Sequence, residues 1–142
     1  MGDTTSASLG TVGVKESFDP KYKSTIPKLI RTKLDKKLKD WTTATQKRLD
    51  AEAAKQKPPG APKNKDFSLD LNFSLKKTDK GVQAVVTSSL NDGDKMFATG
   101  NSSSSTEVRN PSKIDDDVEA VAEDVANDVW TKAAKVFEGR LK

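Results

Sequence analysis

The sequence contains neither histidine nor cysteine. Histidine exchanges protons near neutral pH, and cysteine supplies the thiolate that nucleophilic enzymes and many zinc sites require. Without cysteine, no disulfide can form. We therefore expect a protein that is not an enzyme and has no metal or cofactor. A catalytic centre made of lysine or carboxylate side chains stays open as an alternative.

Apolar residues are also scarce, at 33% of the 142 residues. No apolar run approaches the ~20 residues of a transmembrane helix, so we expect no membrane span. Residues 1–8 lack the charged and apolar regions of a signal peptide, although a leader removed from the natural protein stays open. A core built from so few apolar residues is small, which favours self-association or a protein partner.

Nucleotide-binding and nucleophile motifs are absent as well. The sequence has neither G-x-x-x-x-G-K-[ST] nor G-x-G-x-x-G, and we predict no small-molecule substrate. The run Ser102–Ser105 lies outside any G-x-S-x-G context, so these serines indicate a solvated strand edge, or one that a partner covers.

Three segments in the second half have strand patterns. Residues 67–75 alternate strictly between apolar and polar side chains, which is typical of a half-buried strand. Residues 82–86 and 95–108 follow, separated by Gly81 and by the hairpin dipeptide Asp92-Gly93. The sequence therefore predicts a three-stranded antiparallel β-meander.

A long amphipathic helix is predicted after Ser112, which we expect to be its N-cap. Apolar residues recur at helical spacing from Ile114 to Phe137, with carboxylates in the first turns and basic residues in the last, as the helix dipole favours. The predicted fold class is α+β, in the order α-β-β-β-α, with the C-terminal helix packed on the meander.

The first half is divided by composition. We expect residues 1–24 to be a flexible or partner-bound arm, and 25–57 to be a basic amphipathic helix with Pro27 in its first turn. Residues 58–65 are predicted to be a Pro-rich linker, and 66–142 the β-β-β-α domain.

Charge is strongly segregated along the chain. Residues 21–57 carry twelve Lys and Arg against four acidic residues, whereas 113–128 carry seven carboxylates against one Lys. We expect these segments to attract each other, within one chain or between chains. The predicted partner interface joins apolar and basic residues of the first helix to two aromatics of the last: Lys33, Leu34, Lys36, Lys37, Leu38, Trp41, Trp130 and Phe137.

These observations favour a non-enzymatic structural, assembly or protein-interaction module. It would be a subunit of a larger complex, for example a phage particle or an injection apparatus, in a cytoplasmic or virion-associated location. One alternative is a nucleic-acid-binding adaptor that uses the basic residues of 28–57. An extracytoplasmic accessory domain is another.

Overall fold

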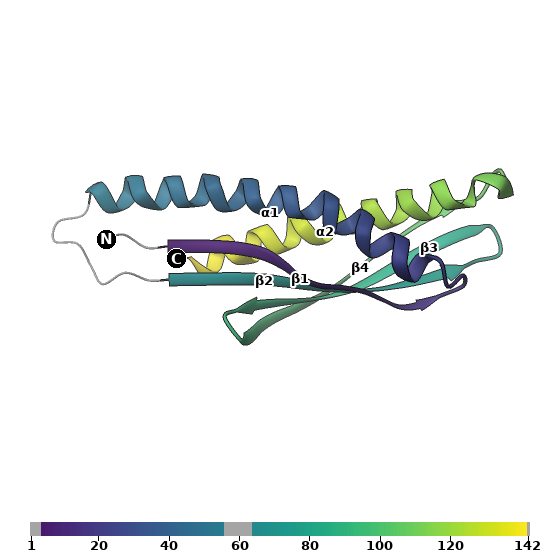
Figure 1. Ribbon diagram of the computed structural model, residues 1–142, viewed down its shortest axis with the longest axis horizontal. Coiled ribbons are helices and arrows are strands. Elements are labelled where there is room, and N and C mark those ends of the chain that lie inside the picture. The colour runs from purple at the N-terminus through teal and green to yellow at the C-terminus, as the bar shows by residue number, and fades with distance from the viewer. Residues whose placement is uncertain (1–3, 56–63, 142) are drawn as a thin grey trace.

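The computed structural model describes residues 4–55 and 64–141. Its secondary structure runs in the order β1 (Thr4–Ser17), α1 (Tyr22–Lys55), β2 (Asn64–Lys77), β3 (Gly81–Asp92), β4 (Lys95–Glu107), the short 3-10 helix η1 (Pro111–Lys113) and α2 (Ile114–Arg140). Both helices cover the same face of a twisted four-stranded sheet, and the opposite face is open (Figure 1). The fold is therefore α+β with two layers.

The sheet has the order β1-β2-β3-β4. β2 pairs antiparallel with β3, and β3 with β4, as the predicted meander requires. The strict alternation of β2 places Phe67, Leu69, Leu71, Phe73 and Leu75 under the helices, all at most 2% exposed. The predicted hairpin between β3 and β4 turns at Gly93, whose φ of 64° suits glycine.

The first strand corrects the predicted topology. Residues 1–24 were expected to form an arm, but Thr4–Ser17 are strand β1, which pairs parallel with β2 along the edge of the sheet. Parallel neighbours need a crossover connection, and α1 provides it. The order is therefore β-α-β-β-β-α with a four-stranded mixed sheet, rather than α-β-β-β-α with three strands.

Helix α1 begins earlier than the sequence indicated. It starts at Tyr22, so Pro27 lies inside the helix rather than in its first turn. The apolar stripe Ile26, Ile30, Leu34 and Leu38 is at most 1% exposed, because it packs in the core beneath the helix. The predicted linker 58–65 falls mostly outside the described residues, and Asn64 already begins β2.

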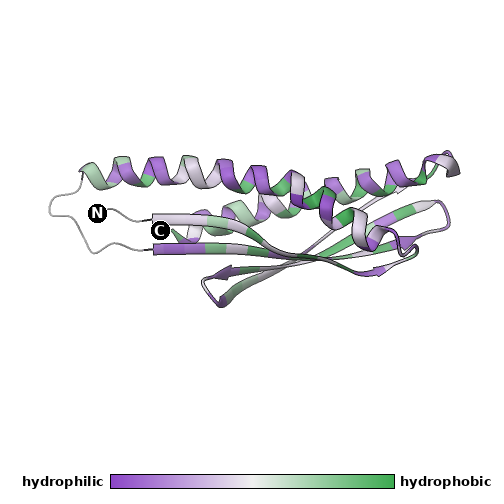
Figure 2. Ribbon diagram, in the orientation of Figure 1, coloured by the Kyte–Doolittle hydropathy of each residue, from purple (hydrophilic) through white to green (hydrophobic). Residues whose placement is uncertain are grey.

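Helix α2 differs from its prediction only at its start. Ser112 does not cap α2: the helix is preceded by Lys113, whose side chain makes no capping hydrogen bond. Asn110 caps η1 instead, and its side chain accepts the Ser112 N–H at 3.1 Å. The carboxylates Asp115, Asp116 and Asp117 occupy the first turn of α2, as predicted. Apolar colour gathers between the helices and the sheet, while the outer helix faces are hydrophilic (Figure 2).

Candidate interaction edge

The two edge strands of the sheet differ in how their outward backbone groups are satisfied. On β1, side chains of α1 cap the edge. Gln46 Oε1 accepts the Thr5 N–H at 2.8 Å, and Thr42 Oγ1 accepts the Ala7 N–H at 3.0 Å. Arg31 donates to the Gly10 carbonyl at 2.7 Å. These contacts leave little of the β1 edge for another strand.

Irregular pairing protects β1 further. Its register with β2 shifts between Leu9 and Val12 and again between Val14 and Glu16. Bulges of this kind bend a strand and disturb the regular row of backbone groups that a new strand would need. Both devices, the capping side chains and the bulges, make β1 a closed edge.

On β4, the backbone groups that point outward can be assigned from the ladder. Val108 donates its N–H to the Lys80 carbonyl at 3.0 Å, toward β3. Backbone groups of successive residues point alternately to the two sides of a strand, and the β3–β4 register is regular from Gly81/Glu107 to Leu90/Ala98. The N–H and C=O groups of Thr99, Asn101, Ser103 and Ser105 therefore point away from the sheet.

These outward groups have no hydrogen-bond partner within the residues that the structure describes. The stretch 98–106 also contains no charged residue and no proline. Natural proteins usually protect an edge strand with charges, proline, bulges or covering side chains. From Ala98 to Thr106, β4 has none of these protections, so this stretch is an open edge.

Helix α2 flanks this open edge with charged side chains. Ser102 Oγ donates to Asp128 Oδ2 at 2.7 Å, and Lys132 lies 3.0 Å from the same carboxylate oxygen. The hydrogen bond from Ser102, and then the Lys132 ammonium, hold the pKa of Asp128 below its usual value. One turn earlier, Ser104 Oγ donates to Asp124 Oδ2 at 2.7 Å.

A shallow surface hollow of about 420 Å³ lies at the open edge, between α2, β4 and residues Gln83 and Val85 of β3. Its lining includes Asn101, Ser102 and Ser103 of β4 together with Asp128 and Lys132 of α2. We call the charged side of α2 next to β4 the α2 flank; its members share one helix face and are Asp117, Asp124, Asp128, Lys132 and Lys135.

The residues predicted for a partner interface are divided between the core and the surface. Leu34, Leu38 and Phe137 are at most 1% exposed and lie in the core. Trp41 and Trp130 are half-buried and meet edge to face, with ring centroids 6.4 Å apart.

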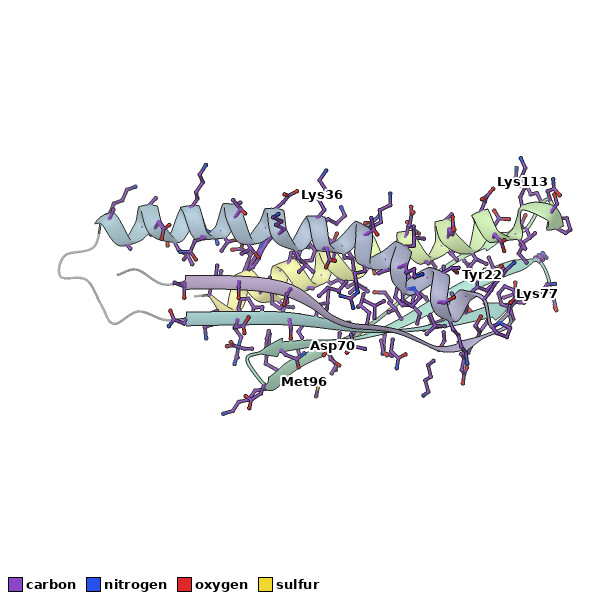
Figure 3. All side chains as sticks on the ribbon, viewed as in Figure 1. Tyr22, Lys36, Asp70, Lys77, Met96 and Lys113 are labelled. Carbon is purple, nitrogen blue, oxygen red and sulfur yellow. The ribbon has the colours of Figure 1, made fainter. Side chains whose placement is uncertain are left out.

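The predicted basic residues are exposed. Lys33 lies 3.9 Å from Glu123 of α2. Lys36 and Lys37 are also solvent-exposed, and Lys36 points away from the sheet, on the side opposite Asp70 (Figure 3). The surface part of the predicted interface therefore consists of lysines and two partly covered tryptophans. Sequence reasoning noted the open β4 edge but named none of its residues as a site.

The expected attraction between the basic and acidic segments occurs within one chain. Besides the contact of Lys33, Arg48 pairs with Glu138 at 2.7 Å, and Lys21 with Asp115 at 2.9 Å. Tyr22 Oη also donates to Asp115, at 2.6 Å. These hydrogen bonds, from Tyr22 first and then Lys21, lower the pKa of Asp115. The contacts join α1 and α2 at both ends.

Two further observations concern metal ligands and membrane spans. Among the described residues, no group of three or more carboxylates is close enough to hold a metal ion. No described helix is long and apolar enough to cross a membrane.

Comparison with solved structures finds distant similarity. No protein-family model matches the chain, and no curated protein matches it. A solved structure described as a "putative lipoprotein" from Caulobacter crescentus CB15 is similar over 93% of this chain and 91% of its own, with 17% identity and a TM-score of 0.47. Similarity at this level carries no information on function.

Proposed function

We propose that the protein is a non-enzymatic protein-interaction module that binds an extended segment of a partner along the open edge of β4. The observation that carries the proposal is the contrast between the two sheet edges. β1 is capped by α1 and interrupted by bulges. By contrast, the outward backbone groups of β4 are unpaired within the described chain, and the strand itself carries no charged residue from Ala98 to Thr106.

An added strand would obtain its affinity from main-chain hydrogen bonds to four residues of β4: Thr99, Asn101, Ser103 and Ser105. Side chains beside the edge would supply specificity, because alternate residues of the incoming strand meet the α2 flank and the open face. The α2 flank offers both Asp128 and Lys132. The proposal applies equally to an extracytoplasmic accessory domain, since it depends on the edge and not on the compartment.

The test uses a displayed library of ten-residue peptides selected on the wild-type protein. Ser103→Pro removes an N–H that points outward, so the monomer retains its own ladder, whereas the matched Ser103→Ala keeps that N–H. Selected peptides should bind wild type and Ser103→Ala alike, and at least about tenfold more weakly to Ser103→Pro.

Amide chemical shifts provide the second readout. Bound peptide should perturb the amides of Thr99, Asn101, Ser103 and Ser105 more than those of β1. Peptides that bind Ser103→Pro as tightly as wild type, or that perturb only other surfaces, would overturn the proposal.

A further inference from the structure

We propose that the occupant of the β4 edge is a second copy of this chain, whose β4 pairs antiparallel with the first about a two-fold axis at Asn101. This inference rests on the proposed function, because it names the partner that the open edge receives. Three features of the edge and of the α2 flank support a self-complementary pairing.

The first feature is the charge distribution of the α2 flank. Its N-terminal half carries Asp117, Asp124 and Asp128, and its C-terminal half carries Lys132 and Lys135. Two such flanks repel when they run parallel and attract when they run antiparallel. A two-fold axis perpendicular to the strands gives the antiparallel arrangement, and a closed dimer of this kind uses the same surface on both copies.

The second feature is the common centre of the strand and the helix. Ser104 contacts Asp124, and Ser102 contacts Asp128, so α2 runs antiparallel to β4. Two residues along β4 thus correspond to four residues along α2. Continued by one more residue of β4, this correspondence places Asn101 beside the midpoint between Asp128 and Lys132. An axis there sets Asp128 of each copy opposite Lys132 of the other. The Asn101 N–H and C=O point outward, so the two copies can exchange both bonds at this position.

The third feature is the sequence of β4 itself. Its charged residues are Lys95 at one end and Glu107 at the other, and everything between them is uncharged. Antiparallel self-pairing therefore brings no like charges together and sets each Lys95 near the Glu107 of the second copy. Charges directly across a strand pair stabilise it when opposite and destabilise it when alike.

The helices also fit this pairing. α2 packs over both β3 and β4, so its axis lies about half a strand spacing inside the edge. With strands ~4.8 Å apart, the two α2 axes would lie about 10 Å apart, close to the 8–10 Å of packed helices. The two flanks would then touch, and the dimer would have one continuous eight-stranded sheet.

Sedimentation velocity of the full chain between micromolar and millimolar concentrations tests the dimer. Asn101→Lys places two like charges at the axis and should weaken association at least about tenfold. The matched control is Thr87→Lys, which adds the same charge to the same sheet face on β3, directly opposite Asn101. This control should leave association unchanged.

A charge swap tests the arrangement of the helices. Asp128→Lys alone gathers four lysines at the axis and should dissociate the dimer. Combining it with Lys132→Asp restores both the pair within each chain and the pairs between chains, and should recover association. Circular dichroism establishes that each variant is folded.

The outcomes separate this inference from the proposed function. A wild-type protein that stays monomeric at millimolar concentration, or a dimer that both Asn101→Lys and Asp128→Lys leave intact, would overturn the two-fold pairing. If the chain is monomeric and the displayed peptides still occupy β4, the edge binds a different protein. If the peptides fail as well, both proposals are wrong.

Discussion

The ionisation of Tyr22 provides a direct test of how α1 is held to α2. Tyr22 is the only tyrosine in the chain, is 3% exposed, and donates a hydrogen bond to Asp115 at 2.6 Å. Burial first, and then the hydrogen bond to the Asp115 carboxylate, raise the pKa of its phenol well above the usual value. The folded protein should therefore keep Tyr22 protonated at a pH where the unfolded chain has lost that proton.

The effect on stability follows from proton linkage. Because the pKa is raised in the folded state, the contribution of Tyr22 is complete below about pH 10 and is lost as the pH rises above it. The loss is about 1.4 kcal/mol per pH unit until the folded-state pKa is reached. Tyr22→Phe removes the hydroxyl, and at neutral pH it should cost about 1 kcal/mol, because the acceptor Asp115 is exposed.

Two measurements check this prediction. Tyrosinate absorbance follows the titration of the one tyrosine in the folded protein, and urea unfolding gives the free energies of wild type and Tyr22→Phe across the alkaline range. Their difference cancels the lysine titrations that both proteins share. It should shrink to zero or change sign near about pH 11. A tyrosine that titrates at its usual pKa while the protein is folded, or a difference that does not vary with pH, would refute the reasoning.

Three further predictions concern the core, a strand contact and the edge. Phe137→Ala removes a fully buried ring stacked in the core, and should lower the free energy of unfolding in urea by about 3–5 kcal/mol. Gly81→Ala should lower the melting temperature because its Cβ would collide with the β4 backbone, whereas Gly139→Ala meets nothing and should raise stability by about 0.5–1 kcal/mol. Ser102→Ala should raise the pKa of Asp128 toward its usual value, which carboxyl NMR titration measures; an unchanged pKa would show that the hydrogen bond contributes nothing.

The meander and α2 could be predicted because each strand or helix satisfies its own local pattern. In β2, every second residue enters the core, so the period of two is unbroken from Phe67 to Leu75. In α2, the buried positions recur at helical spacing from Val118 to Phe137. Neither pattern depends on distant parts of the chain.

The first strand could not be found in this way. Its buried residues are Thr5, Leu9 and Val12, and the shift of register between Leu9 and Val12 breaks the alternation on which strand prediction depends. Its pairing with β2 is parallel and crosses some sixty residues, so no turn motif marks it. The long apolar stripe of α1 was a usable signal for an additional strand. A helix with one buried face must pack against a surface, and a further strand would provide it.

The contrast between local patterns and long-range pairing also explains why part of the predicted partner interface lies in the core. Leu34, Leu38 and Phe137 were predicted to contact a partner, in a chain whose small apolar content favoured association. The strand β1 lies under α1 and enlarges the surface available to Leu34 and Leu38. Phe137 is buried within the same chain against Phe67 of β2 and Trp41 of α1. The sequence indicates an uncharged edge at Ser102–Ser105, but that edge becomes a candidate site only by contrast with the capped edge of β1.

The contacts between the helices also bear on which partner the protein can attract. Carboxylates of α2 neutralise part of the excess positive charge of α1, through the pairs Lys33–Glu123 and Arg48–Glu138. Carboxylates Asp35, Asp40 and Asp50 lie among the remaining lysines on the exposed side of α1. A duplex binder needs several cations free to replace counterions, and each one engaged within the chain reduces that number. The β4 edge has no charged residue between Ala98 and Thr106, and its outward backbone groups have no competing partner within the described chain. For this reason we propose strand addition rather than phosphate binding.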